Sequence, residues 1–386
     1  MYYITMRRNP SYHQMSLDEF LNSPMGFSNR IVSNLNSTTT YTTEVINKEL
    51  LKTVNVQKLI SKLTEFNKMF YELKKKDRHS LYNEFHIPKK SGGLRKIDAP
   101  NEELKSALYV LKAIFEEDFH ALNHTSAFAY VKSRSTIDAV NRHVNNKSEW
   151  YCKLDLHNFF GSTTKEFVMN QLSIIFPFCE VCRTEEGYRE LESAVDLAFL
   201  DNGLPQGTPI SPLITNIMMI PVDHILSNKL RDYDGNHFIY TRYADDFIIS
   251  SRKNFDVRKI ISVIDDTLKS FNAPFRIKPE KTRYGSAAGR NWTLGVMVTK
   301  NENGDIIKTI GSKKKRQFEA MLSSFVLDTK SGKNWSYEDI MILDGYRNYY
   351  IMVEGDSINR IVDHIGAKYN VDIAKMIHEQ KNYVRQ

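Results

Sequence analysis

The sequence has few cysteines and no long apolar run. Cys152, Cys179 and Cys182 are the only cysteines among 386 residues, which excludes a disulfide framework and suits a reducing compartment. No apolar stretch approaches the roughly 20 residues that a membrane-spanning helix needs. No signal-peptide core follows Arg7 and Arg8. We therefore expect a cytoplasmic protein that does not enter a membrane.

The sequence also has little excess of charge for its length. Lys and Arg number 53 against 46 Asp and Glu, which gives a net charge of +7. A basic balance favours an acidic partner, and nucleic acid is the commonest one. Hydrophobic residues make up 41% of the chain, enough for a sizeable core, and the length predicts two or three subdomains.

Patterns for zinc or redox chemistry are lacking too. Cys179 and Cys182 form a C-x-x-C pair, but no second pair lies at zinc spacing. The 11 histidines are scattered, and none stands in an H-E-x-x-H frame. Neither residue type therefore predicts a metal or redox centre.

The secondary-structure pattern predicts an α+β protein, in which helices alternate with antiparallel hairpins. The first 50 residues or so are polar and rich in Ser, Asn and Thr. Further along, the pattern predicts helices at 49–76, 101–119, 257–271 and mostly from 313 onward, a hairpin at 85–100, and strands at 150–160 and 275–281.

Two adjacent acids, Asp245 and Asp246, lie between the β-forming stretches 238–243 and 247–249 (YTRYADDFIIS). The pattern predicts a strand, a turn and a strand, but no Gly or Asn marks the turn. Adjacent like charges repel unless a cation offsets them. Since side chains alternate along a strand, a second carboxylate is needed from elsewhere, and Asp155 at the end of a buried strand is the best candidate.

Carboxylate oxygens are the ligands that Mg²⁺ prefers. Two such ions about 3.5–4 Å apart can activate an attacking oxygen and stabilise a leaving one. Phosphoryl transfer needs mainly positioning and charge neutralisation. We therefore expect two Mg²⁺ ions, for which Mn²⁺ is an expected substitute.

The order of the motifs resembles that of reverse transcriptases over residues 82–386. YADD resembles their Tyr-x-Asp-Asp signature, KLDLHNFF their first acid motif, and GLPQGTPISPLITNI their template and nucleotide loop. IKPEKT and WTLGVMV resemble the motifs after the catalytic hairpin, and IPKKSGGLRKIDAP and AFAYVKSRSTIDAV resemble those of the fingers. The resemblance implies a right-hand polymerase, with fingers, a palm built on an antiparallel sheet and a helical thumb. Such an enzyme makes DNA from dNTPs on an RNA template.

The resemblance also predicts domain bounds. We expect a partly helical N-terminal extension at 1–80, fingers at 81–150, a palm at 151–305 and a helical thumb at 306–386. A finger-like insertion would occupy about 163–200 of the palm.

By position in these motifs, the resemblance implies that Asp155 and Asp245 are the principal metal ligands and that Asp246 supports them. Phe160, five residues after Asp155, matches the steric gate that leaves no room for a 2′-hydroxyl. Ordinary core packing is the alternative for Phe160. For Asp246 the alternative is a role in organising the turn.

Other residues match the nucleotide site. Gln206 and Gly207 would face the template and the incoming base, Arg95 with Lys89 or Lys90 would contact the triphosphate, and Lys281 would lie near the leaving pyrophosphate. A solvated surface is the alternative for these cations.

Primer and template contacts are also implied. Tyr243 would pack beneath the primer end, with core packing as the alternative. A basic run would grip RNA phosphates, with a solvated helix start as the alternative: Lys313, Lys314, Lys315 and Arg316.

Retron signatures are approximated by IDAVNRHV and VTKNENG but not met, which favours the related defence-associated bacterial enzymes. For these the resemblance implies a cognate non-coding RNA as template, a role in antiphage defence and an effector from a neighbouring gene. The alternatives are template-independent or protein-primed DNA synthesis, and an RNA-binding protein with a silent polymerase palm. An RNA-dependent RNA polymerase is disfavoured by Phe160. The sequence does not fix the oligomeric state.

Overall fold

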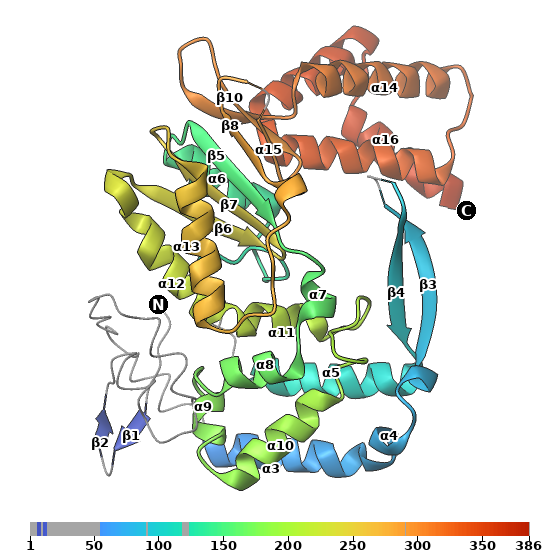
Figure 1. Ribbon diagram of the computed structural model, residues 1–386. Helices are drawn as coiled ribbons and strands as arrows, with labels where there is room; N and C mark the ends of the chain where they lie inside the picture. The colour runs from blue at the N-terminus through green and yellow to red at the C-terminus, as the bar shows by residue number, and fades with distance from the viewer. Residues whose placement is uncertain are drawn as a thin grey trace. The chain divides into compact units, whose positions relative to one another are not determined.

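The computed structural model describes residues 55–89, 92–117, 123–289 and 291–385, together with the backbone of 6–8 and 11–13. The expected polar extension therefore lies almost wholly outside the described residues, as does Lys90. Helices and strands alternate along the described chain (Figure 1), which confirms the α+β prediction. Among the described residues, no helix has the length and apolar character needed to cross a membrane.

The chain forms two compact units, which interleave along the sequence. Unit 1 consists of Met1–Arg134, Cys152–Ile249 and Phe255–Tyr284. Unit 2 consists of Ser135–Tyr151, Ser250–Asn254 and Gly285–Gln386. This division does not test the predicted domain bounds, which remain predictions.

The helices of unit 1 gather around a large apolar core. Helix α3 packs against α5, α9 and α10, α11 packs against α8, and α12 packs against α13. They are α3 (Val56–Met69), α4 (Tyr71–Lys75), α5 (Glu102–Glu117), α7 (Phe159–Ser162), α8 (Lys165–Leu172), α9 (Phe178–Val181), α10 (Glu185–Asp196), α11 (Ser211–Met218), α12 (Ile220–Arg231) and α13 (Val257–Ser270), with the 3-10 turns η2 (His79–Leu81), η3 (Tyr233–Gly235) and η4 (Pro279–Lys281).

Helix α3 shows how the sequence specifies these helices. The Asn55 side chain accepts a hydrogen bond from the Lys58 N–H (3.0 Å) and so caps the first turn. Leu59, Leu63 and Phe66 then recur at helical spacing and are buried. The predicted helix therefore forms, although it begins later than the sequence pattern suggested.

An exposed hairpin, β3 (Tyr82–Pro88) and β4 (Leu94–Pro100), projects from the helices of unit 1 (Figure 1). Its strands pair antiparallel, with Tyr82 opposite Pro100 and Pro88 opposite Leu94. Gly92 and Gly93 adopt positive φ angles of 87° and 79°, which glycine accepts without steric cost. The predicted hairpin around a Gly-Gly turn is confirmed. A second, short pair consists of β1 (Met6–Arg8) and β2 (Ser11–His13).

A four-stranded sheet has the order β6-β7-β5-β8. Its strands are β5 (Trp150–Asp155), β6 (Phe238–Tyr243), β7 (Asp246–Ser251) and β8 (Arg283–Ser286). Because β5 lies beside β7, the end of β5 comes next to the turn that joins β6 to β7. Helix α12 packs against β6 and buries that face of the strand.

The strand predicted at 275–281 is wrong. Pro279 opens the 3-10 turn η4, and β8 begins at Arg283. Pro274 and Pro279 have no N–H to give to a sheet ladder, which is why this stretch stays irregular. Its place beside β5 is instead fixed by single contacts, among them a bridge between Leu156 and Ile277.

Unit 2 combines a small sheet with long helices. Its strands have the order β11-β10-β9, and helix α6 packs against β10 and β11. Helix α15 is interrupted at Glu354 (φ −148°, ψ 58°). The predicted C-terminal helices are present. The elements are α6 (Thr136–Asn145), β9 (Asn291–Thr293), β10 (Val296–Lys300), β11 (Ile306–Thr309), α14 (Ser312–Lys330), α15 (Tyr337–Tyr369) and α16 (Ile373–Arg385).

Candidate active site

Asp155 is the last residue of β5 and is only 9% exposed. Two backbone hydrogen bonds fix its position. The Leu156 N–H donates to the Asp245 carbonyl (3.1 Å), and the Lys278 N–H donates to the Asp155 carbonyl (2.8 Å). These hydrogen bonds bring segments far apart in the sequence together at Asp155 and Asp245.

The turn that carries the paired acids is strained. Ala244 and Asp245 form it, and Asp246 is the first residue of β7. Ala244 adopts a left-handed conformation (φ 56°), which in turns of this kind normally falls to Gly, Asn or Asp. Strain of this kind concentrates at functional sites.

The carboxylates of this site influence one another electrostatically. Burial, and then the charges of Asp245 and Asp155, raise the pKa of Asp246 to about 6. Burial also raises the pKa of Asp245, and the charge of Asp155 adds to that effect. Negative charge is therefore held together here at an electrostatic cost, a pattern typical of functional sites.

Two lysines bring positive charge to the same place. The Lys278 Nζ lies 2.9 Å from Asp155 Oδ1, and the Lys281 Nζ lies 2.8 Å from Asp155 Oδ2. The hydrogen bond to Asp155 is the main reason that the pKa of Lys281 is raised, so this lysine is protonated at neutral pH. In this arrangement, no group of three or more His, Cys, Asp or Glu side chains in the described part of the chain could hold a metal ion.

A buried ion pair links the acid-bearing hairpin to helix α12. Arg242 (1% exposed) donates from Nε and Nη2 to both carboxylate oxygens of Asp223 (0% exposed) at 2.7–3.0 Å. The Tyr240 hydroxyl donates to the same carboxylate (2.7 Å), and Arg242 Nη1 donates to the Asn216 side chain and to the Ala244 carbonyl, both at 3.3 Å. This network anchors the acid-bearing turn to helices α11 and α12.

Phe160 lies at the start of α7, with its ring half-buried. The ring stands edge-to-face against Phe159 (5.7 Å between centroids) and against Tyr130 (6.4 Å). The Leu204 N–H donates to the Phe160 carbonyl (3.0 Å), which ties the predicted gate to the following loop.

The loop that holds Gln206 and Gly207 is fastened to the exposed hairpin. The Asp98 N–H of β4 donates to the Gln206 carbonyl (2.9 Å). Gly207 has a φ of 125°, and a Cβ atom there would lie 2.9 Å from the Asp98 carbonyl oxygen. Gly207 therefore permits a close approach that a side chain would block.

The cations predicted to bind triphosphate are on the exposed hairpin. Arg95 pairs with Ile87 across the strands and is exposed. The positive charge of Arg95 lowers the pKa of Tyr130. Lys89 is also exposed, at the start of the turn.

The sequence profile of one family, described as "Reverse transcriptase (RNA-dependent DNA polymerase)", matches residues 87–319, more than half of the chain. The matched range includes Asp155, Asp245 and Asp246. The chain belongs to the reverse transcriptase family.

Several proteins similar to this chain are retron reverse transcriptases. Retron Ec73 reverse transcriptase of Escherichia coli is 32% identical over 208 residues, which are 53% of this chain and 64% of that protein. Retron Ec83 reverse transcriptase, also of E. coli, is 27% identical over 302 residues, 74% of this chain and 87% of that protein. The chain is thus similar to bacterial retron reverse transcriptases, and its match to Retron Ec73 reverse transcriptase spans less than two thirds of that protein's length.

One solved structure shows a weak overall similarity to this chain. Apo telomerase from Candida Tropicalis is 14% identical, with a TM-score of 0.42, over 80% of this chain and 63% of that chain. This likeness is too weak to bear on the function of the reverse transcriptase.

The predicted nucleic-acid contacts of unit 2 differ from one another in environment. Lys313 and Arg316 are exposed. The Lys314 Nζ lies 4.5 Å from the centroid of the Trp292 ring, whereas Lys315 is bonded to Glu354. The charge of Lys315 is therefore balanced within the protein.

Tyr243 ends β6 and is half-buried, directly before the acid-bearing turn.

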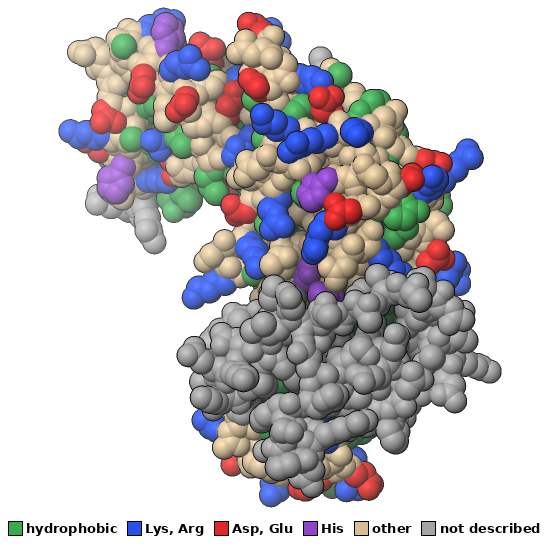
Figure 2. Space-filling model, turned by 90° about the vertical axis from the view of Figure 1, so that its left-hand side faces the viewer, with side chains coloured by type: hydrophobic (Ala, Val, Ile, Leu, Met, Phe, Trp, Pro, Cys, Tyr) green, Lys and Arg blue, Asp and Glu red, His purple; other side chains and the backbone are tan. Residues whose placement is uncertain are grey.

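On the face in Figure 2, the Lys and Arg side chains of the described residues are interspersed with Asp and Glu side chains. The modest positive excess is thus spread over this face.

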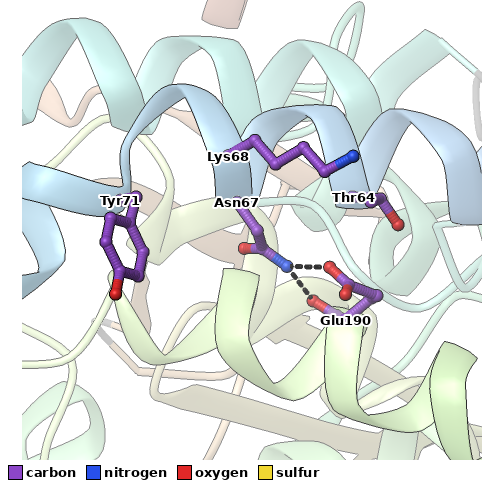
Figure 3. A pocket seen from close by; sticks show the side chains of 5 residues that line it. All are labelled: Thr64, Asn67, Lys68, Tyr71 and Glu190. Carbon is purple, nitrogen blue, oxygen red and sulfur yellow. Dashed lines mark hydrogen bonds between the residues drawn. The ribbon is translucent and has the colours of Figure 1, made fainter.

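A separate pocket lies between α3 and α10 (Figure 3). It has a volume of about 360 Å³ and is lined by Thr64, Asn67, Lys68, Tyr71 and Glu190. Asn67 Nδ2 donates to the Glu190 backbone carbonyl (2.9 Å) and side chain (2.5 Å) and so bridges the two helices. The pocket shares no residue with the acid site.

Proposed function

We propose that this chain extends a 3′ end with dNTPs by copying an RNA template, and that the chemistry takes place at Asp155, Asp245 and Asp246. The observation that carries the proposal is the backbone hydrogen bond that joins the end of β5, which carries Asp155, to the β6–β7 turn, which carries the paired acids. Membership of the reverse transcriptase family supports it.

We propose that the same carboxylates hold two Mg²⁺ ions, which Mn²⁺ could replace. The donor chemistry fits, because the acids are oxygen ligands whose mutual repulsion a cation would relieve. Lys278 and Lys281 would have to release the carboxylate of Asp155 for the metal to bind it. When bound, the ions would supply activation of the 3′-hydroxyl and neutralisation of the transferring phosphate.

The remaining roles follow from the position of each side chain. Lys281, once released from Asp155, would lie near the leaving pyrophosphate and donate a proton to it. Arg95 and Lys89 would hold the triphosphate from the exposed hairpin, where arginine suits paired phosphate oxygens. The Phe160 ring would exclude a 2′-hydroxyl, and Gln206 would contact the sugar or base through its amide.

The template and the biological role are proposed from the retron relatives. We propose that the template is a cognate non-coding RNA and that the DNA product serves antiphage defence with an effector from a neighbouring gene. Similarity to retron enzymes of E. coli supports this proposal.

One assay tests the core of the proposal. The purified protein, with the RNA that co-purifies, receives Mg²⁺ and labelled dNTPs beside the Asp245→Asn variant, and the products are sequenced. Asp266→Asn, which removes an acid from the exposed surface of α13, is the matched control. The proposal expects DNA complementary to a discrete bound RNA from the wild type and the control, none from Asp245→Asn, and none after chelation of the metal.

Each of the other outcomes would favour a different mechanism or contradict the polymerase proposal. DNA of simple or random sequence would favour template-independent synthesis, and DNA attached covalently to a tyrosine would favour protein priming. If RNA and dNTPs are present and no DNA forms in any sample, the polymerase proposal is wrong.

A further inference from the structure

Tyr130 is an exposed aromatic residue at the edge of the acid site. It is 58% exposed and lies in the segment after α5. Its backbone is left-handed (φ 58°), which is an outlier for a bulky side chain. A residue that is both strained and exposed has not been placed there by core packing, and such strain concentrates at functional sites.

The segment that carries Tyr130 is attached to the strand that leads into the paired acids. The Phe128 N–H donates to the Arg242 carbonyl (2.9 Å), and the Arg242 N–H donates to the Ser126 carbonyl (2.6 Å). The Asn216 side chain donates to the Ala129 carbonyl (2.7 Å). The position of the segment is therefore fixed relative to β6.

The segment is also closed upon itself. Arg134 Nη1 donates to the His124 carbonyl and to the Ala127 carbonyl, both at 2.6 Å. These bonds join the two ends of the turn that presents Tyr130. The ring is thus displayed by a braced loop at a defined place, as a wall of a binding site requires.

The Tyr130 ring meets Phe160 at close to a right angle. Their centroids are 6.4 Å apart with an interplanar angle of 73°, an edge-to-face geometry. On another side, Phe160 stands edge-to-face against the buried ring of Phe159. Tyr130 therefore packs edge-to-face against the half-buried Phe160 ring, which itself packs edge-to-face against a buried core ring.

Charges of the proposed site act on Tyr130. Burial raises the pKa of the Tyr130 hydroxyl, the charges of Asp245 and Tyr243 raise it further, and Arg95 lowers it. An acid proposed to bind metal and a cation proposed to bind triphosphate therefore both influence this side chain electrostatically.

We propose that the Tyr130 ring is the second wall of the pocket for the sugar of the incoming nucleotide. In this role Tyr130 is a positioning residue, because it holds the Phe160 ring in the orientation that excludes a 2′-hydroxyl. The inference rests on the proposed function and names a determinant of sugar selectivity outside the acid motifs.

The test compares four variants in primer extension with dNTPs and with rNTPs. Tyr130→Ala removes the ring, Tyr130→Gly removes it while relieving the left-handed strain, and Tyr130→Phe keeps the ring without the hydroxyl. Tyr109→Ala removes a similarly exposed tyrosine (53%) from the surface of α5 and is the matched control. Circular dichroism and thermal melting show which variants are folded.

The ring hypothesis makes a graded prediction. Tyr130→Ala and Tyr130→Gly should lower the preference for dNTPs over rNTPs about two- to tenfold, the scale of one aromatic pair, and should raise the KM for dNTPs more than they lower kcat. Tyr130→Phe and Tyr109→Ala should match the wild type. In a Phe160→Ala background, Tyr130→Ala should change sugar selectivity no further, since its action passes through Phe160.

Other results would overturn the inference. Unchanged sugar selectivity in folded Tyr130→Ala and Tyr130→Gly would show that the ring has no such role. A Tyr130→Phe variant that behaves like Tyr130→Ala would assign the effect to the hydroxyl instead. If the wild type copies no RNA at all, the proposed function fails, and this inference fails with it. If the wild type makes DNA but the Tyr130 variants keep its sugar selectivity, only the inference about Tyr130 fails.

Discussion

The β6–β7 hairpin contributes residues to two charged clusters, and these are built in opposite ways. Arg242 and Asp223 are both buried, and charge-assisted hydrogen bonds join them. Asp155, Asp245 and Asp246 stand together, and burial and mutual repulsion raise the pKa of both acids of the turn. In the first cluster charge is balanced, whereas in the second the acids outnumber the two lysines that approach Asp155.

The difference separates a scaffold from a reaction centre. A paired, fully hydrogen-bonded cluster fixes the position of its strand, and removing one partner leaves an uncompensated charge. A cluster of like charges destabilises the folded protein through repulsion. Such clusters are found mainly at functional sites, where their charge acts on a ligand. The first cluster therefore sets the position of the second, because Arg242 also binds the Ala244 carbonyl of the acid-bearing turn.

Replacement of Asp245 should give the largest effect and should affect activity alone. Asp245→Asn should lower the rate of nucleotide addition by on the order of 1,000-fold or more, because charge stabilisation dominates phosphoryl transfer. Since burial and Asp155 both oppose the charged form of Asp245, its removal should leave the Tm unchanged or slightly higher. Single-turnover extension and thermal melting measure the two quantities. A loss of folding would contradict the proposed division of roles.

Replacement of Asp223 should do the reverse and act on stability. Asp223→Asn leaves the Arg242 guanidinium buried beside a neutral group, which should cost about 3–5 kcal/mol of unfolding free energy. Urea unfolding followed by circular dichroism measures this cost. The double variant Asp223→Leu/Arg242→Met, which removes both charges, should recover much of the stability. If the double variant is as unstable as the single one, packing rather than charge pairing explains the loss.

The sequence allowed the acid hairpin to be predicted better than the network that supports it. Asp245 and Asp246 stand out because adjacent acids between two β-forming stretches need an explanation, and order along the chain points to Asp155. Arg242 also carries a signal in the sequence. It shares a strand face with Tyr240, and this alternation indicates a buried partner.

Other features could not be predicted, because they depend on pairings distant in sequence. The partner of Arg242 is Asp223, the single acid of helix α12, and only the packing of α12 against β6 brings the two together. Tyr130 is similar, since its contact with Phe160 requires the strand order and the hydrogen bonds of its loop. Lys278 was missed because Lys281, three residues later, was sufficient to match the motif.

Replacement of Phe160 tests whether this ring belongs to the nucleotide site or to the hydrophobic core. Phe160→Ala should lower discrimination against ribonucleotides about 10- to 200-fold, because the space beneath the sugar opens without loss of a charged group. The rate with dNTPs should fall far less than in Asp245→Asn. Competition between dNTPs and rNTPs in one primer-extension reaction measures the ratio. Unchanged selectivity would assign Phe160 to the core with Phe159 instead.

The smallest effects should come from the basic run of α14, where the same contrast between balanced and unbalanced charge recurs. Lys313 and Arg316 are exposed. Lys313→Ala and Arg316→Ala should therefore each weaken RNA binding a few-fold. Each should also reduce the slope of log K against log salt concentration by about one, the value for one lost phosphate contact.

Lys315 should behave differently from these two neighbours. Lys315 is bonded to Glu354, whose carboxylate also accepts from the Thr309 hydroxyl (2.6 Å), so it braces the interruption of α15 rather than meeting solvent. Lys315→Ala should therefore lower the Tm and leave the salt dependence of RNA binding unchanged. Binding titrations at several salt concentrations separate the two classes. If the salt dependence of RNA binding falls equally in all three variants, Lys315 leaves Glu354 when RNA binds. The ion pair between Lys315 and Glu354 would then exist only in the RNA-free protein.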